Sequence, residues 1–223
     1  KVLLLPNGLR DPYIQSFPID VARTEKRLPQ KDLIIGYLGS GFEKDIDLMY
    51  SSFRTLKKMV GDVKLLHVGR SNYHTETDEA VICTGSVSYE DISLFLSACD
   101  IFWFPLRRTP ANFGRFPLKF SDYLTVGRPI ISTDVGDLAE WIRSLQVGLI
   151  GMDNPESISR IVLEIAQSCE QKSVMGANAV QASKKFEFSW EKRAEELQDF
   201  YFSQIARTRE LNNHGIDEVQ VLQ

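Results

Sequence analysis

The residues best suited to chemistry lie in one segment, residues 100–129, which reads DIFWFPLRRTPANFGRFPLKFSDYLTVGRP. An apolar run at residues 101–104 leads into a basic loop, and Pro117 stands where a helix should begin. The unpaired N–H groups of a first helical turn, together with the positive end of the helix dipole, attract anions. This order of strand, polar loop and helix N-terminus predicts a site for a ligand that carries phosphate.

Two polar residues of the expected helix, Lys119 and Asp122, are three positions apart and therefore share one face. Asp122 lies five residues beyond Pro117, which is roughly 7–8 Å along a helix axis at a rise of 1.5 Å per residue. That length resembles the separation between the distal phosphate of a nucleotide and its ribose hydroxyls. A phosphate at the amides of residues 113–116 would leave Asp122 to accept hydrogen bonds from the ribose. The alternative is a surface ion pair that contributes a few tenths of a kcal/mol.

A second loop of small residues, GSGFEKD at residues 39–45, also follows an apolar run. Its spacing fits neither the dinucleotide-binding fingerprint nor the P-loop, so it is a weak signal by itself. Lys44 could neutralise a phosphate, although a lysine near a helix start is more often only solvated. Arg107, Arg108 and Arg115 add positive charge to the first loop, and guanidinium groups suit bidentate phosphate contacts.

The elements that must position these loops alternate along the chain, because short apolar runs are separated by segments with helical spacing. The apolar runs cover residues 33–40, 63–69, 80–87, 101–105, 129–134 and 147–152. A sheet with one wet face shows alternation, whereas a parallel sheet buried on both faces does not. The pattern therefore predicts a doubly wound α/β fold with a parallel sheet. Ligands bind such sheets beyond the carboxyl ends of the strands, where both loops would lie.

Residues 31–188 are expected to form this sheet domain. Residues 1–30 contain an apolar run before an Asn-Gly turn, and we expect an interdomain strand and linker that follow a missing N-terminal domain. Residues 189–210 should form a closing helix that Ser189 can cap. Residues 211–223 have no helical pattern and are expected to be a tail.

Composition narrows the classes of partner. The net charge is −4 and the pI about 5.5, so the chain lacks the basic footprint of a nucleic-acid-binding domain. No apolar run approaches the roughly 20 residues that span a bilayer, and three widely spaced cysteines suit a reduced interior. We expect a cytoplasmic location without a transmembrane segment, and leave open peripheral membrane contact through the missing domain. The histidines and cysteines lack metal-ligand spacing, so neither a metal nor another cofactor is expected.

Five motifs, in order along the chain, resemble the C-terminal half of a GT-B glycosyltransferase of family 4, also called group 1. They are LLPNG (4–8), GYLGSGFEKDIDLM (36–49), GSVSYEDISLFLSACDIFWFP (85–105), PLKFSDYLTVGRPIISTDVGDLAEWI (117–142) and FSWEKRAEELQDFY (188–201). The resemblance implies a domain that binds a nucleoside-diphosphate sugar, usually UDP- or GDP-linked, for transfer with retention of anomeric configuration. It also implies that the acceptor and the usual catalytic groups belong to the N-terminal domain.

The family pattern also assigns residues. Asp122 takes the place of the second glutamate of a paired motif, which holds the ribose, and Lys44 takes that of the phosphate-binding lysine. The backbone from Gly85 to Val87 would contact the base. Together with the residues argued above, the expected donor-binding set is Gly39, Ser40, Lys44, Gly85, Val87, Asn112, Gly114, Arg115, Phe116, Lys119 and Asp122.

Three features depart from the family pattern. Gly114 stands where the first glutamate is expected, with Asn112 as the nearest polar substitute, and Ser40 stands where an arginine should follow Gly39. The loop to Lys44 is also one residue shorter than is usual in the family. Gly114 and Ser40 favour one alternative, a non-catalytic interaction module on a degenerate transferase fold. Among enzymes, the alternative is a GT-B sugar-nucleotide epimerase.

Overall fold

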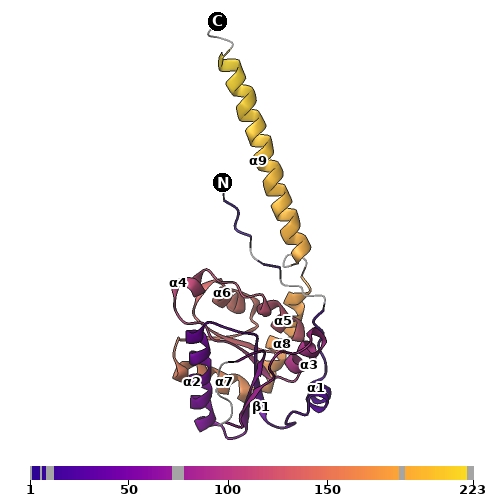
Figure 1. Cartoon of the computed structure of the whole chain (residues 1–223), viewed down its shortest axis with the longest axis vertical. Helices are drawn as coiled ribbons and strands as arrows, with labels where there is room; N and C mark the ends of the chain where they lie inside the picture. The colour runs from indigo at the N-terminus through magenta and orange to yellow at the C-terminus, as the bar shows by residue number, and fades with distance from the viewer. Residues whose placement is uncertain (1, 6, 9–12, 72–77, 186–188, 220–223) are drawn as a thin grey trace.

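The structure is a computed structural model that describes residues 2–5, 7–8, 13–71, 78–185 and 189–219. Over these residues the chain folds around a parallel sheet in the order β3-β2-β1-β4-β5-β6 (Figure 1). The strands are β1 (Leu33–Leu38), β2 (Val63–Val68), β3 (Val81–Cys83), β4 (Ile101–Phe104), β5 (Ile130–Thr133) and β6 (Gly148–Gly151). The doubly wound parallel α/β fold that the apolar runs predict is therefore confirmed.

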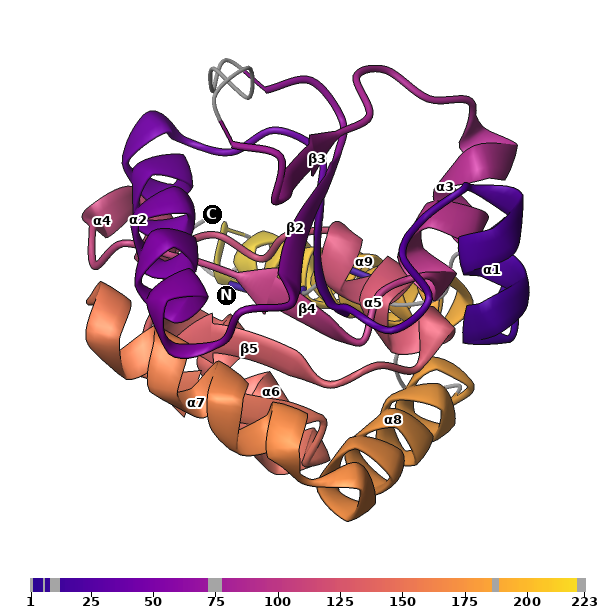
Figure 2. The ribbon, with the colours of Figure 1, turned by 90° about the horizontal axis from the view of Figure 1, so that it is seen from below.

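Helices cover both faces of the sheet (Figure 2). They are α1 (Ile19–Glu25), α2 (Glu43–Met59), α3 (Tyr89–Ser97), α4 (Pro110–Phe113), α5 (Lys119–Val126), α6 (Gly136–Leu145), α7 (Pro155–Gln167), α8 (Cys169–Ser183) and α9 (Trp190–Val219). Adjacent strand residues enter different cores: Trp103 packs with α2 and α7, whereas Phe102 packs with α5 and the helices of the other face. Since both residues are fully buried, the strand has no polar face to show in the sequence.

The order in which the chain adds strands to the sheet reverses between β1 and β4. These two central strands pair only through Ile35 with Ile101 and Gly36 with Phe102, and the chain winds outward from them on either side. Loops that leave the carboxyl ends of such strands diverge and open a crevice between them. The loops after β1 and β4 are the two that the sequence singles out.

The helix that carries Lys119 and Asp122 begins later than predicted. Its first residue is Lys119, because the turn before it is of the 3₁₀ type: the N–H groups of Phe120 and Ser121 donate to the carbonyls three residues earlier, on Pro117 and Leu118. The axial separation estimated from a regular helix starting at Pro117 therefore does not apply. The helix ends as expected at Gly127, whose φ of 76° is left-handed.

Side chains cap the starts of several helices. Thr109 caps the short helix α4 in the loop after β4. Ser168 follows α7, and its side chain accepts from the N–H of Gln171 at the start of α8. Ser189 caps α9 as predicted, with its hydroxyl accepting from the N–H of Lys192.

Both ends of the chain depart from the expectation. Residues 2–5 form no strand, and Val2 and Leu4 are almost fully exposed, because no strand of the described chain lies beside them. The segment expected to be a tail is helical as far as Val219, since α9 continues through it and projects from the body of the molecule (Figure 1). None of the described helices combines the length and apolarity needed to cross a bilayer.

Candidate functional site

Three glycines form a wall at the carboxyl end of the sheet. Gly39 and Gly69 directly follow β1 and β2, Gly85 lies two residues beyond β3, and all three have positive φ. Gly69 and Gly85 form an antiparallel bridge, and a Cβ atom on Gly69 would lie only 3.1 Å from the Cα of Gly39. The three loops therefore lie against one another. Gly85 itself faces open space, which suits the predicted approach of a ligand to its backbone.

Lys119 reaches this wall from α5. Its Nζ donates to the carbonyl of Ser40 at 3.3 Å and lies 4.1 Å from the centre of the Tyr37 ring and 5.8 Å from that of Phe104. An ammonium group above aromatic faces is attracted by the ring quadrupoles. The Tyr37 hydroxyl also donates to the Ser40 carbonyl, at 3.1 Å, so that two donors hold the loop after β1.

The electrostatics of the site centre on Lys119. Burial lowers its pKa to about 7, and the nearby Arg115 guanidinium acts in the same direction, while Asp122 and Asp45 oppose the shift. Burial likewise raises the pKa of Tyr37 to about 12. An anion placed beside Lys119 would favour its charged form, so the group is suited to bind phosphate.

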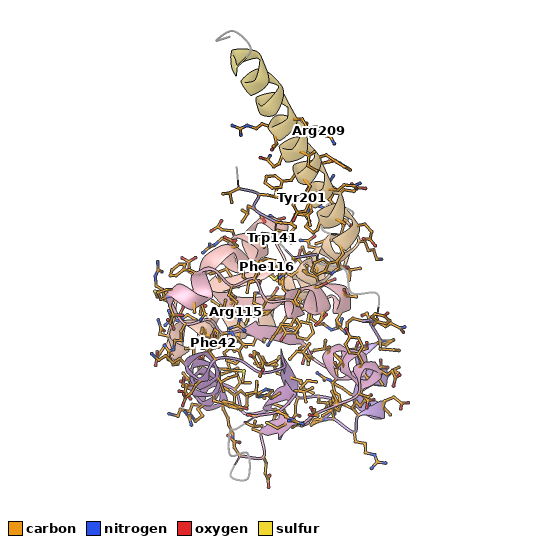
Figure 3. The ribbon with its side chains drawn as sticks, turned by 45° about the horizontal axis from the view of Figure 1, so that its top comes forward. Phe42, Arg115, Phe116, Trp141, Tyr201 and Arg209 are labelled. Carbon is orange, nitrogen blue, oxygen red and sulfur yellow. The ribbon has the colours of Figure 1, made fainter. Side chains whose placement is uncertain are left out.

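Arg115 lies near Lys119 and contacts the loop after β1. Its guanidinium lies 4.8 Å from the centre of the exposed Phe42 ring, and Nη1 is 3.3 Å from Oδ2 of the buried Asp45 (Figure 3). Asp122 is half-buried and close enough to raise the pKa of Lys119, and its contact with ribose stays a prediction.

Asp45 links the loops of β1 and β4 beneath the surface. Oδ1 accepts from the backbone N–H of Arg107 at 2.7 Å and from Nδ2 of Asn112 at 2.8 Å. Arg107 in turn pairs with Asp153, after β6, at 2.8 Å. This buried carboxylate is a residue that the sequence reasoning missed, because its partners lie more than sixty positions away.

Asn112 does not replace the absent glutamate. It is buried, and its amide is occupied by Asp45 and the Arg107 carbonyl. The predicted anion site at the amides of residues 113–116 is also wrong in part. The N–H of Phe113 donates to Thr109, and that of Arg115 donates to Asn112, because α4 and the turn after it use these groups internally.

Phe116 is a packing residue. Its half-buried ring makes edge contacts with Phe120 at 5.9 Å and with Trp141 at 5.2 Å, and its carbonyl accepts from the side chain of Asn7 (Figure 3). The structure thus orients its side chain toward α5 and α6. Gly114, by contrast, lies where an added Cβ would meet open space.

Lys44 is exposed in the first turn of α2 and lines a hollow of about 220 Å³ with Phe42, Thr109 and Asn112. Val87 is half-buried against the core, and the contact of its backbone with a base stays a prediction.

A cavity of about 530 Å³ lies on the other side of the β1 loop. It is lined by Ser40, Gly41, Glu43, Ile46, Asp47, His67, Arg70 and Ser71. Ser40 is the one predicted donor-binding residue in this lining. His67 and Tyr37 could have been noticed as polar side chains at the ends of two apolar strands, where they are register partners.

Groups of three or more side chains that could hold a metal ion are absent from the described part of the chain. Lys119 and Arg115 place two cations beside the loop after β1. The arrangement can therefore bind an anion against Lys119, beside the glycine loops.

The fold is shared with solved glycosyltransferases. Sucrose-phosphate synthase from Thermosynechococcus elongatus matches with a TM-score of 0.73 at 19% identity, over 92% of this chain and 53% of that one. HepE of Anabaena, solved in complex with UDP and glucose, matches with a TM-score of 0.72 at 15% identity, over 90% of this chain and 56% of that one.

Sequence comparisons also match the chain to glycosyltransferases. An uncharacterized glycosyltransferase of Methanocaldococcus jannaschii is 25% identical over 154 residues, which cover 67% of this chain and 42% of the relative. The chain thus spans about half the length of the proteins it matches. The model of the family described as "Glycosyl transferases group 1" matches residues 32–168, which is more than half of the chain. The chain belongs to the group 1 glycosyltransferase family, in agreement with the resemblance of its motifs.

Proposed function

We propose that this chain is the donor-binding domain of a retaining glycosyltransferase that uses a nucleoside-diphosphate sugar. The observation that carries the proposal is the position of Lys119, whose ammonium lies against Tyr37 and the Ser40 carbonyl, with Arg115 and Asp122 beside it. HepE, which has the same fold, binds UDP and glucose, and this supports a uridine diphosphate donor.

In the proposed complex, the diphosphate lies against Lys119, beside the Gly39 loop. Cleavage of the sugar C1–O bond leaves negative charge on the diphosphate, and cations already in place stabilise that charge without reorganisation. Lys119 and Arg115 supply these cations, so the proposed chemistry needs no metal ion. Asp122 accepts hydrogen bonds from the ribose, and the backbone from Gly85 to Val87 contacts the base. The acceptor and the remaining catalytic groups are assigned to an N-terminal domain.

The test is calorimetric titration of the chain with UDP and GDP, in parallel for Lys119→Met and Lys44→Met. We expect saturable binding of one nucleotide and a loss of about tenfold or more in affinity for Lys119→Met, since a charge-assisted contact of about 1.5–3 kcal/mol is removed. Lys44→Met removes the same charge from the neighbouring hollow and should weaken binding by less. Flat titrations with both nucleotides would reject the proposal.

The ribose contact is tested separately. Asp122→Ala should weaken UDP binding but leave the affinity for 2′,3′-dideoxy-UDP unchanged, because that ligand has no diol to donate to the carboxylate. Equal losses for both ligands would assign Asp122 to the support of Lys119 instead.

A second candidate is a non-catalytic interaction module on the same fold. It is favoured by the open space at Gly114 and by the buried Asn112, which together leave the place of the first glutamate without a carboxylate. This candidate predicts a partner protein and no nucleotide binding, so the same titrations distinguish the two.

A further inference from the structure

We propose that His67 is a positioning residue for the donor diphosphate, acting through the peptide that joins Gly39 to Ser40. The inference rests on the proposed function, because it explains how the loop after β1 presents hydrogen-bond donors to an anion. His67 is not itself expected to touch the donor.

His67 is held in the interior at the end of β2, with 1% of its surface exposed. It is the register partner of Tyr37, and the two rings meet edge to face at 5.1 Å. A buried polar ring is costly unless both nitrogens are hydrogen-bonded. Here both are.

The partners define the tautomer of His67. Nε2 lies 2.9 Å from the Gly39 carbonyl oxygen, which can only accept, so Nε2 carries the proton and donates. Nδ1 then has a free lone pair and accepts from the hydroxyl of Tyr50 at 2.9 Å. The Tyr50 oxygen lies 3.0 Å from the hydroxyl of Ser71, which continues the chain of hydrogen bonds. Burial and the charge of Lys119 lower the pKa of His67, in keeping with a neutral ring.

The hydrogen bond from His67 fixes the direction of the peptide between Gly39 and Ser40. In a trans peptide the C=O and N–H groups point in opposite directions, so a Gly39 carbonyl that is tied to His67 sends the Ser40 N–H to the other side of the loop. The φ of 78° at Gly39 allows this orientation. The next carbonyl, on Ser40, accepts hydrogen bonds from Tyr37 and Lys119.

The carbonyls of Gly39 and Ser40 are therefore both directed at the protein. A carbonyl oxygen turned outward would repel a diphosphate, whereas successive N–H groups attract it. In this way His67 would select the loop conformation that accepts an anion. Tyr50 would act one step further away, by donating to Nδ1 and so holding the orientation of the His67 ring.

The experiment compares His67→Leu with His67→Gln in calorimetric titrations with UDP and with uridine. A glutamine amide can still donate to the Gly39 carbonyl, whereas leucine cannot. We expect His67→Leu to weaken UDP binding about tenfold, the effect of about 1.4 kcal/mol, and to leave uridine binding unchanged. His67→Gln should recover most of the UDP affinity.

Ser159→Ala is the matched control. The hydroxyl of Ser159 is buried and donates to the carbonyl of Ser52 at 2.8 Å, remote from the β1 loop. Its loss should lower thermal stability without changing the ratio of UDP to uridine affinity. That ratio separates positioning of the phosphates from a general loss of structure.

Tyr50→Phe provides a variant that keeps the histidine. Nitrogen-15 NMR should find the His67 proton on Nε2 both in the unchanged protein and in Tyr50→Phe, because the Gly39 carbonyl still accepts it, and UDP affinity should fall less in Tyr50→Phe than in His67→Leu. A proton on Nδ1 in the unchanged protein, or undiminished UDP binding by His67→Leu, would overturn the positioning role alone. Absence of nucleotide binding by the unchanged protein would overturn the proposed function, and this inference with it.

Discussion

The phenol oxygen of Tyr123 lies 2.8 Å from the amide nitrogen of Leu38 and accepts its hydrogen bond. The Tyr123 ring is fully buried and stacks on Phe102, with centroids 4.1 Å apart and planes inclined by 8°. A side chain of α5 thus supplies a hydrogen-bond acceptor at the end of β1. The helix that carries Lys119 is thereby fixed to the strand whose loop forms the opposite wall of the site.

Replacing Tyr123 with phenylalanine should therefore destabilise the protein. The change leaves the Leu38 N–H without its acceptor, at a cost of about 1–3 kcal/mol in the free energy of unfolding. Urea unfolding followed by circular dichroism measures it. Tyr201→Phe is the control, because Tyr201 is exposed on α9 and should change stability by less than about 0.5 kcal/mol. Equal effects of the two changes would contradict the assignment.

Lys119 should make stability depend on pH. Its pKa is lowered to about 7 in the folded protein from an ordinary value of 10.5, so the unfolded chain binds more protons between these limits. The free energy of unfolding therefore gains a contribution that rises with pH from about 7 to 10.5. Lys119→Met lacks this contribution, so its free energy of unfolding should exceed that of the unchanged protein by the largest amount below pH 7.

Urea titrations at several pH values from 6 to 10 test this dependence on Lys119. The difference in unfolding free energy between Lys119→Met and the unchanged protein should shrink as the pH rises. Lys58→Met, which removes an exposed lysine near the end of α2, should give a difference that stays constant. A constant difference for Lys119→Met as well would show that its ammonium is not buried.

Gly69→Ala should disturb the glycine wall. The residue has a φ of 135°, which an L side chain adopts only under strain, and its new Cβ would press on the backbone of Gly39. We expect a loss of about 1–3 kcal/mol in stability, together with weaker UDP binding. Gly61→Ala is the matched change, because a Cβ there meets nothing within 4 Å and the φ is not positive. If Gly69→Ala leaves UDP binding unchanged, the glycine wall does not belong to the donor site.

Removal of the Asp45 carboxylate should be the most damaging of these substitutions. Asp45→Ala leaves the Arg107 N–H and the Asn112 amide without their acceptor and Arg115 without its counter-charge, at a cost of about 3 kcal/mol or more. The midpoint of urea unfolding should fall accordingly. Asp199→Ala, on the exposed surface of α9, should leave that midpoint nearly unchanged. Similar midpoints for both variants would contradict the structural role of Asp45.

Much of the fold could be predicted because it depends on local signals. The strands of a parallel sheet are buried on both faces, so Trp103 and its neighbour Phe102 read as one apolar run. Helix starts such as Ser189 are encoded by a side chain that accepts from a nearby N–H. The end of α9 could not be predicted in this way, since its sequence carries no clear stop or amphipathic pattern beyond residue 210.

The candidate site, too, could be predicted from the sequence only in part. The sequence alone predicted which loops meet at one edge of the sheet and singled out Gly39, Lys119 and Asp122 on them, because the order of strands and helices determines which loops share an edge. Only the tertiary structure showed that Lys44 lines a separate hollow beside Phe42, that Asn112 is buried and that His67 donates to the Gly39 carbonyl. Those outcomes depend on contacts between residues distant in the chain, where burial and hydrogen-bond partners, rather than residue type, decide what a side chain can do.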